Sequence, residues 1–158
     1  MARGAVVVAV AVVAVSLDKL WGYAHTDNPR VVEQSALVNV ANAACARMRE
    51  AAASSAVGTA ASISRRVGAI NAQNDDVTQM VATIRRLVPA DQLAADAPAN
   101  EWLEDWGRLV RQRDAYARSL VAGKPTPLAM PVIDGRGLKE RLDSVGLNCR
   151  VPVVLLTP

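Results

Sequence analysis

The sequence predicts an all-α fold: an antiparallel bundle or hairpin of about three long helices, followed by an irregular, Pro/Gly-rich C-terminal segment that a disulfide holds in place. Three stretches of roughly 20 or more residues carry apolar side chains at helical spacing. The chain contains no Phe, and much of its 51% hydrophobic content is Ala and Val, which suits closely packed helices. Pro125, Pro127 and Pro131 favour extended backbone within residues 123–158.

Residues 4–17 form an uncharged apolar run that follows Arg3. A membrane-spanning helix needs about 20 such residues, whereas the core of a signal peptide has about 7–15. We therefore expect residues 1–24 to be a signal peptide, with Gly22 and Ala24 at a candidate cleavage site, or a transmembrane anchor flanked by Lys19 and Trp21. A buried core element is a third reading, which the position at the N-terminus disfavours. The helical domain, residues 25–158, is then expected outside the cytoplasm, at the cell membrane or secreted.

The first helix is expected from about residue 29, because Asn28 can cap it and Pro29 is tolerated in a first turn. Gly58 and Thr59 indicate a break before the next helix, although one long Ala-rich helix also fits the pattern. The apolar face of this first helix contains Val31, Val38, Ala41, Cys45, Met48 and Ala52.

The second helix has the most regular pattern in the chain, with apolar residues alternately four and three positions apart. Asn74 interrupts this seam, and a buried Asn in such a position often fixes helix register or the choice of partner. Residues 71–76 are polar and would suit a loop, but the unbroken periodicity favours a continuous helix that Pro89 ends. The seam consists of Ile63, Val67, Ile70, Asn74, Val77, Val81, Ile84 and Val88.

Residues 89–98 are expected to form a loop, after which Asp96 or Asn100 caps a third helix that Gly123 ends. Two tryptophans one turn apart on this helix either fill the core or form a shelf on which a ligand stacks. A basic residue, Arg113, lies on the same apolar face. The residues predicted to pack or interact on this helix are Trp102, Trp106, Arg113 and Tyr116.

The C-terminal segment is expected to contain a turn at Asp134–Gly135 and a short helix that Gly146 ends. Cys45 and Cys149 are the only cysteines, and an even number in an exported chain favours a disulfide. A bond between them would close a loop of about 104 residues, which the loop-entropy model values at about 4–5 kcal/mol. Two buried free thiols are the alternative.

No motif in the sequence indicates a cofactor, a metal or a catalytic centre. A serine triad is excluded because His25 is the only histidine, and it lies in the linker after the apolar run. Glu101 lies one helical turn before Glu104 and Asp105, so these carboxylates could do acid–base chemistry, but acids in the first turn of a helix more often serve its dipole and its cap. The net charge of +3 comes from bases that alternate with acids, so we expect no nucleic-acid binding.

Several features together resemble a group of uncharacterised actinobacterial proteins: Gln73–Asn74, Trp102 and Trp106, the Arg113-Asp-Ala-Tyr116 stretch, the Asp134–Gly135 turn and a late Cys149. The likeness covers roughly residues 60–152. It implies one N-terminal transmembrane helix and a helical extracytoplasmic domain, and it implies no activity. The apolar N-terminal run is shorter here than in that group.

The function expected from these observations is that of a non-enzymatic interaction protein of the cell envelope, attached to the membrane or secreted, with a protein partner. One alternative is a small exported all-helical enzyme of the chorismate-mutase kind, which would need Arg113 and other charged groups to line a pocket. Another is a binder of small ligands at Trp102 and Trp106. A dry core containing both Trp rings, together with an exposed apolar patch, would favour the protein partner.

Overall fold

The computed structural model describes residues 30–32 and 34–157, and it is mostly helical, as the sequence predicts. Residues 1–24, expected to be a signal peptide or anchor, lie outside the described residues, as do Asn28 and Pro29. The long helices are α2 (Ser35–Ser54), α3 (Ile63–Leu87) and α5 (Ala97–Val121). The short elements are α4 (Ala90–Ala95), β1 (Val132–Ile133), β2 (Arg136–Gly137), α6 (Leu138–Asp143) and α7 (Val153–Leu156).

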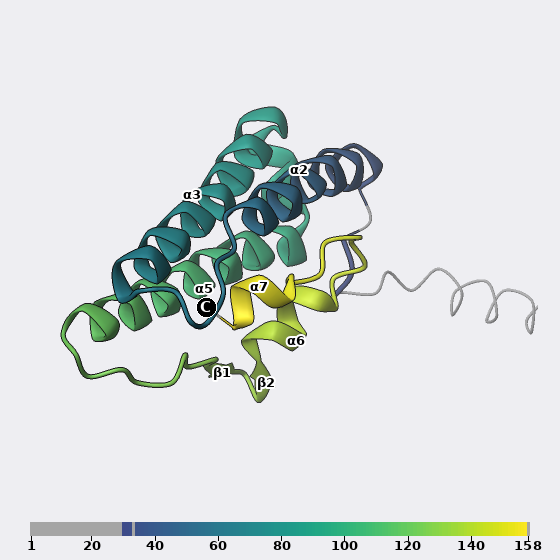
Figure 1. The fold of residues 1–158 in the computed structure, drawn as a ribbon. Coiled ribbons are helices and arrows are strands. Elements are labelled where there is room, and N and C mark those ends of the chain that lie inside the picture. Colours follow the sequence, from purple (N-terminus) through teal and green to yellow (C-terminus); the bar gives the residue numbers. More distant parts are fainter. Residues whose placement is uncertain (1–29, 33, 158) are drawn as a thin grey trace, which may run out of the picture.

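Helix α3 lies between α2 and α5, and each of these runs in the direction opposite to it (Figure 1). Gln73 of α3 bonds Ala52, near the end of α2, while Met80 lies beside Cys45, near its middle. The residue numbers along α3 therefore increase as those of their partners on α2 decrease, so the two helices are antiparallel. Because Ser54 ends α2, the first two turns of α3 extend beyond it.

Helix α2 begins at Ser35, so the expected start near residue 29 is wrong. The backbone N–H of Val32 instead donates to the carbonyl oxygen of Val145 at 3.0 Å, which holds this stretch against the C-terminal segment. The helix ends at Ser54, and the hydroxyls of Ser54 and Ser55 donate to the carbonyl oxygen of Ala51. A break therefore separates α2 from α3, and the alternative of one long helix is wrong.

Helix α3 is continuous from Ile63 to Leu87, as the seam predicts, and no loop interrupts it at residues 71–76. Its cap is Ser62, whose hydroxyl accepts from the N–H of Arg65 and which lies three residues beyond the break expected at Gly58 and Thr59. The middle of the seam is buried, but Ile63 is 51% exposed in the first turn. Ile63 is exposed because α2 ends at Ser54 and does not reach the first turn of α3.

Residues 90–95 form the short helix α4 instead of the expected loop, because Leu93 can then turn into the core. Asp96 caps α5 as predicted, and its carboxylate accepts from the N–H of Ala99 at 3.3 Å. At the other end Gly123 has a φ of 67°, the left-handed conformation that commonly ends a helix.

The C-terminal segment runs back along the helices as an extended chain, a two-stranded hairpin and two short helices (Figure 1). Asp134 and Gly135 both have positive φ between Ile133 and Arg136, the conformation of a tight hairpin turn. Gly146 follows α6 with a φ of 78°. The buried side chain of Leu155 brings α7 onto the core.

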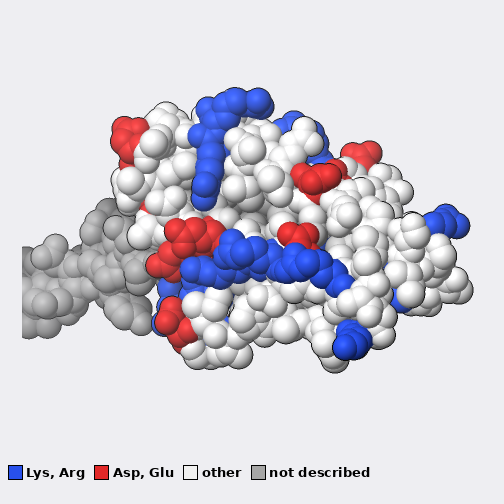
Figure 2. Space-filling model, turned by 90° about the vertical axis from the view of Figure 1, so that its left-hand side faces the viewer, with Lys and Arg blue, Asp and Glu red and all other residues white. Residues whose placement is uncertain are grey.

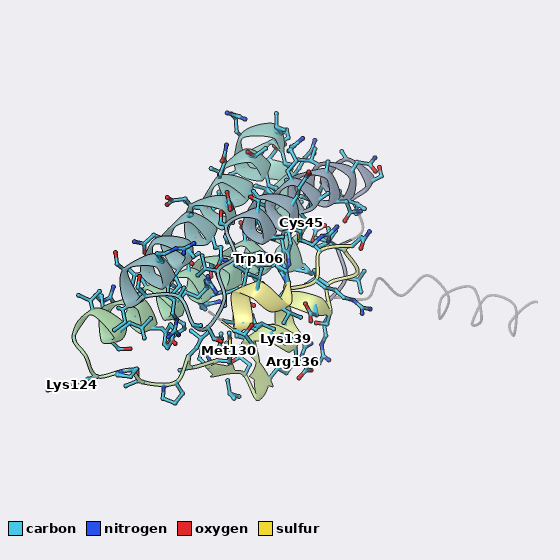
Figure 3. The ribbon with its side chains drawn as sticks, in the orientation of Figure 1. Cys45, Trp106, Lys124, Met130, Arg136 and Lys139 are labelled. Atoms are coloured by element: carbon cyan, nitrogen blue, oxygen red, sulfur yellow. A yellow bond between two sulfur atoms is a disulfide. The ribbon has the colours of Figure 1, made fainter. Side chains whose placement is uncertain are left out.

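The main core joins the long helices to this segment through Trp106, Leu138 and Leu155. Cys45 on α2 and Cys149 lie at disulfide distance, with their Cα atoms 5.5 Å apart, so the predicted pairing is confirmed. The Sδ atom of Met80 lies 3.3 Å from Cys45 Sγ and covers the pair on the α3 side. Figure 3 places Cys45 and Trp106 inside the molecule, whereas Lys124 lies at the tip of the turn after α5.

Candidate functional site

Arg113 lies at the centre of the molecule with none of its surface exposed. Its guanidinium has three acceptors from two elements other than its own helix. Nε donates to Asn74 Oδ1 at 2.7 Å, Nη2 donates to Gln73 Oε1, and Nη1 donates to the carbonyl oxygen of Leu155. A planar guanidinium with donors in a fixed fork suits such a set of acceptors. Arg113 therefore joins α5 to α3 and α7.

The two amides that receive Arg113 have further partners of their own. Asn74 Nδ2 donates to Asp114 Oδ1 at 2.6 Å, and Gln73 Nε2 donates to the carbonyl oxygen of Ala52 at 3.3 Å. The network thus reaches α2 and fixes which turn of α5 faces which turn of α3. Gln73 could have been suspected from the sequence only because it precedes Asn74, whereas a backbone carbonyl such as that of Leu155 leaves no sequence signal.

The environment of Arg113 is electrostatically unusual because, among the described residues, no carboxylate bonds it directly. Burial lowers its pKa to about 10, while the charge of the neighbouring Asp114 acts in the opposite direction. The guanidinium remains charged at neutral pH and is enclosed by protein. The chorismate-mutase-like alternative would need Arg113 to line a pocket, whereas the described residues hold its donors in hydrogen bonds to protein acceptors.

Trp102 and Trp106 pack against each other edge to face, with ring centroids 6.1 Å apart and planes at 85°. Trp102 is 1% exposed and Trp106 is fully buried. Within the described part of the chain neither indole N–H has a hydrogen-bond acceptor. The rings fill the core, and Trp102 also lines the charged cleft described below.

Tyr116 lies one turn beyond Arg113 but belongs to a different set of contacts. Its hydroxyl accepts from Arg66 Nη2 at 2.8 Å, and its ring packs beside the small buried cluster of Ile70, Ala117 and Leu120. The predicted residues consequently do not form one site. The structure joins Asn74 to Arg113, while the tryptophan pair, Tyr116 and the cysteine pair each lie elsewhere.

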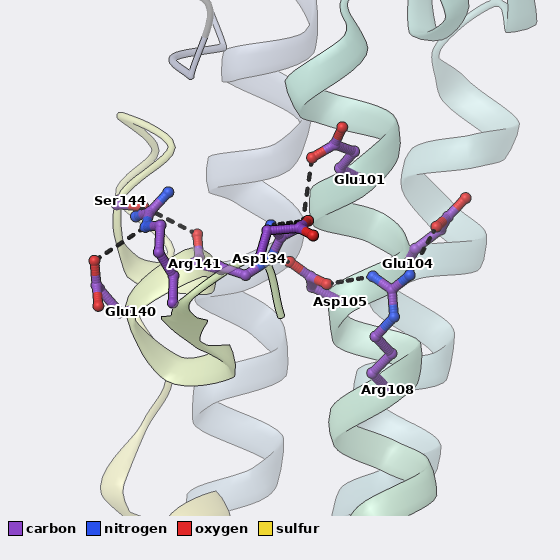
Figure 4. A network of polar contacts seen from close by, with 9 residues as sticks. Glu101, Glu104, Asp105, Arg108, Asp134, Glu140, Arg141 and Ser144 are labelled. Atoms are coloured by element: carbon purple, nitrogen blue, oxygen red, sulfur yellow. Dashed lines mark hydrogen bonds and ion pairs between the residues drawn. The ribbon is translucent and has the colours of Figure 1, made fainter. Parts of the chain in front are cut away.

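A network of ion pairs connects α5 to the C-terminal segment (Figure 4). The carboxylate of Asp105, only 2% exposed, accepts from Arg141 Nε at 2.7 Å and also from Arg108. The hydrogen bond to Asp105, more than any other contact, raises the pKa of Arg141. Glu104 also pairs with Arg108, at 3.4 Å on the surface of α5.

A charged cleft of about 90 Å³ opens beside this network, between α5 and α6. We use this name for the cavity whose charged lining residues are Arg30, Glu101, Asp105, Arg136 and Arg141. Arg136 and Arg141 already pair with acids, Arg136 with Glu140 and Arg141 with Asp105 and Glu101. This cleft could not be predicted from the sequence, because the residues that line it come from segments far apart in the chain.

A second opening lies where the start of α3 and the end of α5 extend beyond α2. We call it the α3–α5 groove, and its volume is about 350 Å³. It lies on the side of α3 that presents Val67 and Asn71, and its most exposed apolar residue is Val121, at 70%. The lining residues are Val67, Asn71, Asp114, Ala117, Arg118, Val121 and Ala122.

Figure 2 views the molecule from this end and displays rows of basic and acidic groups separated by broad uncharged areas. Neither Arg118 nor Val121 is among the residues predicted from the sequence to interact, although both follow Asp114 at helical spacing on α5. These two residues can be recognised as part of a groove only when it is known that α2 ends before reaching this region.

No protein-family model, no curated protein and no solved structure matches this chain. Among residues 30–32 and 34–157, no helix has the length and apolar character needed to cross a membrane. The same residues contain no group of three or more His, Cys, Asp or Glu side chains arranged to hold a metal ion.

Proposed function

We propose that this chain is a non-enzymatic helical interaction domain that acts outside the cytoplasm, tethered to the membrane or secreted, and binds a protein through the α3–α5 groove. The observation that carries the proposal is the exposed apolar lining of this groove on two helices whose opposite faces are firmly packed. Val121 is 70% exposed there, directly beyond the buried Ala117 and Leu120. Grooves between helices commonly receive an apolar helix face from a partner.

The remaining polar chemistry of the domain is structural. Arg113 is enclosed by protein acceptors, and Asp105 is held between two arginines. Neither is free to take part in a reaction. This pattern supports an interaction protein over an enzyme.

The proposed location rests on sequence and on the cysteines. Residues 4–17 have the character of a signal peptide or anchor. A pair at disulfide distance, such as Cys45 and Cys149, is typical of proteins that fold in an oxidising compartment. The likeness to actinobacterial proteins with one transmembrane helix stays a prediction that agrees with both signs.

A second candidate function, small-ligand binding or catalysis by an exported enzyme, is favoured by the charged cleft. Three arginines and two acids line it, which is the mixture that the enzyme alternative expects. Its volume of about 90 Å³ is small beside the range of about 300–1,000 Å³ for ligand pockets. The α3–α5 groove, at about 350 Å³, is therefore the stronger site.

Photocrosslinking tests the proposal in intact cells that express the full-length chain. A photoreactive amino acid at Val121 should give a discrete crosslinked product. The matched control places the same photoreactive amino acid at Leu87. Leu87 is the last residue of α3 and is 55% exposed, and it lies at the end of that helix away from the groove. Equal products from both positions, or none from Val121, would contradict the proposal.

A thermal-shift screen of the purified chain with small anionic and cationic metabolites tests the second candidate. Stabilisation by one compound, lost on substitution of Arg136 by Gln, would favour the charged cleft. The interaction proposal expects no compound to act in this way.

A further inference from the structure

We infer that the occupant of the α3–α5 groove is a second copy of this chain, related to the first by a two-fold axis. This inference rests on the proposed function, because it takes the groove to be the interaction surface and names its partner. The argument comes from the order of side chains along the last turns of α5 and from their charges.

The lining that α5 contributes follows the spacing of a helix-packing seam. Asp114, Ala117, Arg118 and Val121 stand at positions i, i+3, i+4 and i+7, and so lie on one face. Ala117 is buried against Ile70 and Leu120 at the base of this face, so Asp114, Arg118 and Val121 are the residues that can meet another helix. The face thus has the pattern needed to pack against a helix.

The charges of this face complement one another under two-fold symmetry. Two antiparallel copies of α5, crossing near Ala117, set Arg118 of each copy close to Asp114 of the other. In a two-fold interface the same patch serves both partners, so it must carry both signs. A strongly acidic or strongly basic partner would leave one of these two charges unmatched, which disfavours it.

Both charged groups are available for such a pairing. Within the described part of the chain, no carboxylate forms an ion pair with Arg118, which is exposed. Asp114 uses Oδ1 to accept from Asn74, which leaves Oδ2 for a donor from the other copy. The buried network thereby fixes the position of a carboxylate at the rim of the groove.

The groove is short, so the expected dimer is weak. A standard interface takes about 20–30 residues from each partner, whereas the lining of the α3–α5 groove consists of seven residues. We expect a dissociation constant on the order of 10–100 µM. Attachment of both copies to one membrane would raise their effective concentration.

Sedimentation equilibrium of the purified full-length chain, in detergent matched to the density of the solvent, tests the inference. Val121→Asp and Arg118→Glu should each weaken the dimer by about tenfold or more, since each introduces an unmatched charge. The matched controls are Leu87→Asp and Arg85→Glu, at exposed positions near the other end of α3, and these should change the dissociation constant by less than about twofold. Circular dichroism of every variant should retain the wild-type helix signal.

A monomer at all concentrations, or a dimer that Val121→Asp and Arg118→Glu leave intact, would overturn the inference. The photocrosslinking experiment separates this failure from failure of the proposed function. A product at Val121 that contains two copies of this chain supports both proposals. A product with a different protein supports the proposed function and refutes the homodimer, and absence of any product refutes both.

Discussion

The guanidinium of Arg113 donates to the side-chain oxygen of Asn74 at 2.7 Å, although the two residues are 39 positions apart in the sequence. Each residue interrupts an otherwise apolar helix face, and each satisfies the other where the two faces meet. A buried polar group without such a partner costs free energy, so the correct alignment of α3 and α5 is favoured over neighbouring ones. The same contact explains why an arginine and an asparagine occur in a core that is otherwise largely apolar.

Replacing Arg113 by Met should lower the free energy of unfolding by about 3–5 kcal/mol, because it leaves buried acceptors on α3 and α7 without a donor. Arg113→Lys should cost less, since an ammonium retains the charge and reaches some of the same acceptors. Urea unfolding followed by circular dichroism measures both. A loss below about 1 kcal/mol for Arg113→Met would show that the network contributes little to stability.

Removal of the cysteine pair by Cys45→Ala and Cys149→Ala should lower the free energy of unfolding by about 2–5 kcal/mol. The reason is that the unfolded chain loses a constraint across 104 residues. Wild-type protein should migrate faster on gels without reductant than with it. Labelling of both thiols in denatured, unreduced protein would contradict the bond.

Asp76→Asn should stabilise the protein at neutral pH. Oδ2 of Asp76 is buried without a hydrogen-bond partner among the described residues. Burial, with a smaller effect of Asp75, raises its pKa above 3.8. The folded state therefore holds this proton at higher pH than the unfolded state, and its contribution to stability falls as the pH rises from about 4 through the raised value.

The gain from Asp76→Asn should accordingly amount to a few degrees in Tm at most at pH 7 and disappear near pH 3, where both states are protonated. Thermal unfolding across this pH range measures it. Asp75→Asn, a change at an exposed position next to it, is the control and should give a smaller gain. A variant whose advantage persisted at pH 3 would owe it to something other than the charge.

Gly146→Ala should lower the free energy of unfolding by about 1–3 kcal/mol. Gly146 has a φ of 78°, and a Cβ atom there would lie 2.6 Å from Cγ1 of Val31. Gly58→Ala is the control, because nothing lies within 4 Å of its added methyl group. Urea unfolding should leave that control unchanged or slightly more stable. Equal effects of the two substitutions would contradict this account of Gly146.

Much of the helical architecture could be predicted from the sequence because it depends on local patterns. The seam from residue 63 to residue 88 predicts α3 almost to its ends, and the capping residue Asp96 predicts the start of α5. Such signals act within one or two turns of a helix. The start of α2 at Ser35 escaped prediction, since it depends on the backbone bond between Val32 and Val145.

The candidate site was much less predictable. Asn74 and Arg113 could each be recognised as polar interruptions of an apolar face, but nothing in their spacing relates one to the other. The α3–α5 groove depends on where α2 ends relative to α3, and the charged cleft depends on the return of Arg136 and Arg141 to the side of α5. These are consequences of tertiary packing, which a single sequence does not encode in local form.

The bond from Arg113 to the carbonyl oxygen of Leu155 also sets an order of events during biosynthesis. Helices α2, α3 and α5 are complete in the nascent chain well before residue 155 has been added, and until then one donor of the central guanidinium lacks its acceptor. The guanidinium therefore gains its full set of acceptors only when the last short helix has docked. A chain truncated before that helix should keep the three long helices but leave a buried donor without a partner, and proteases should cleave it faster than the full-length chain.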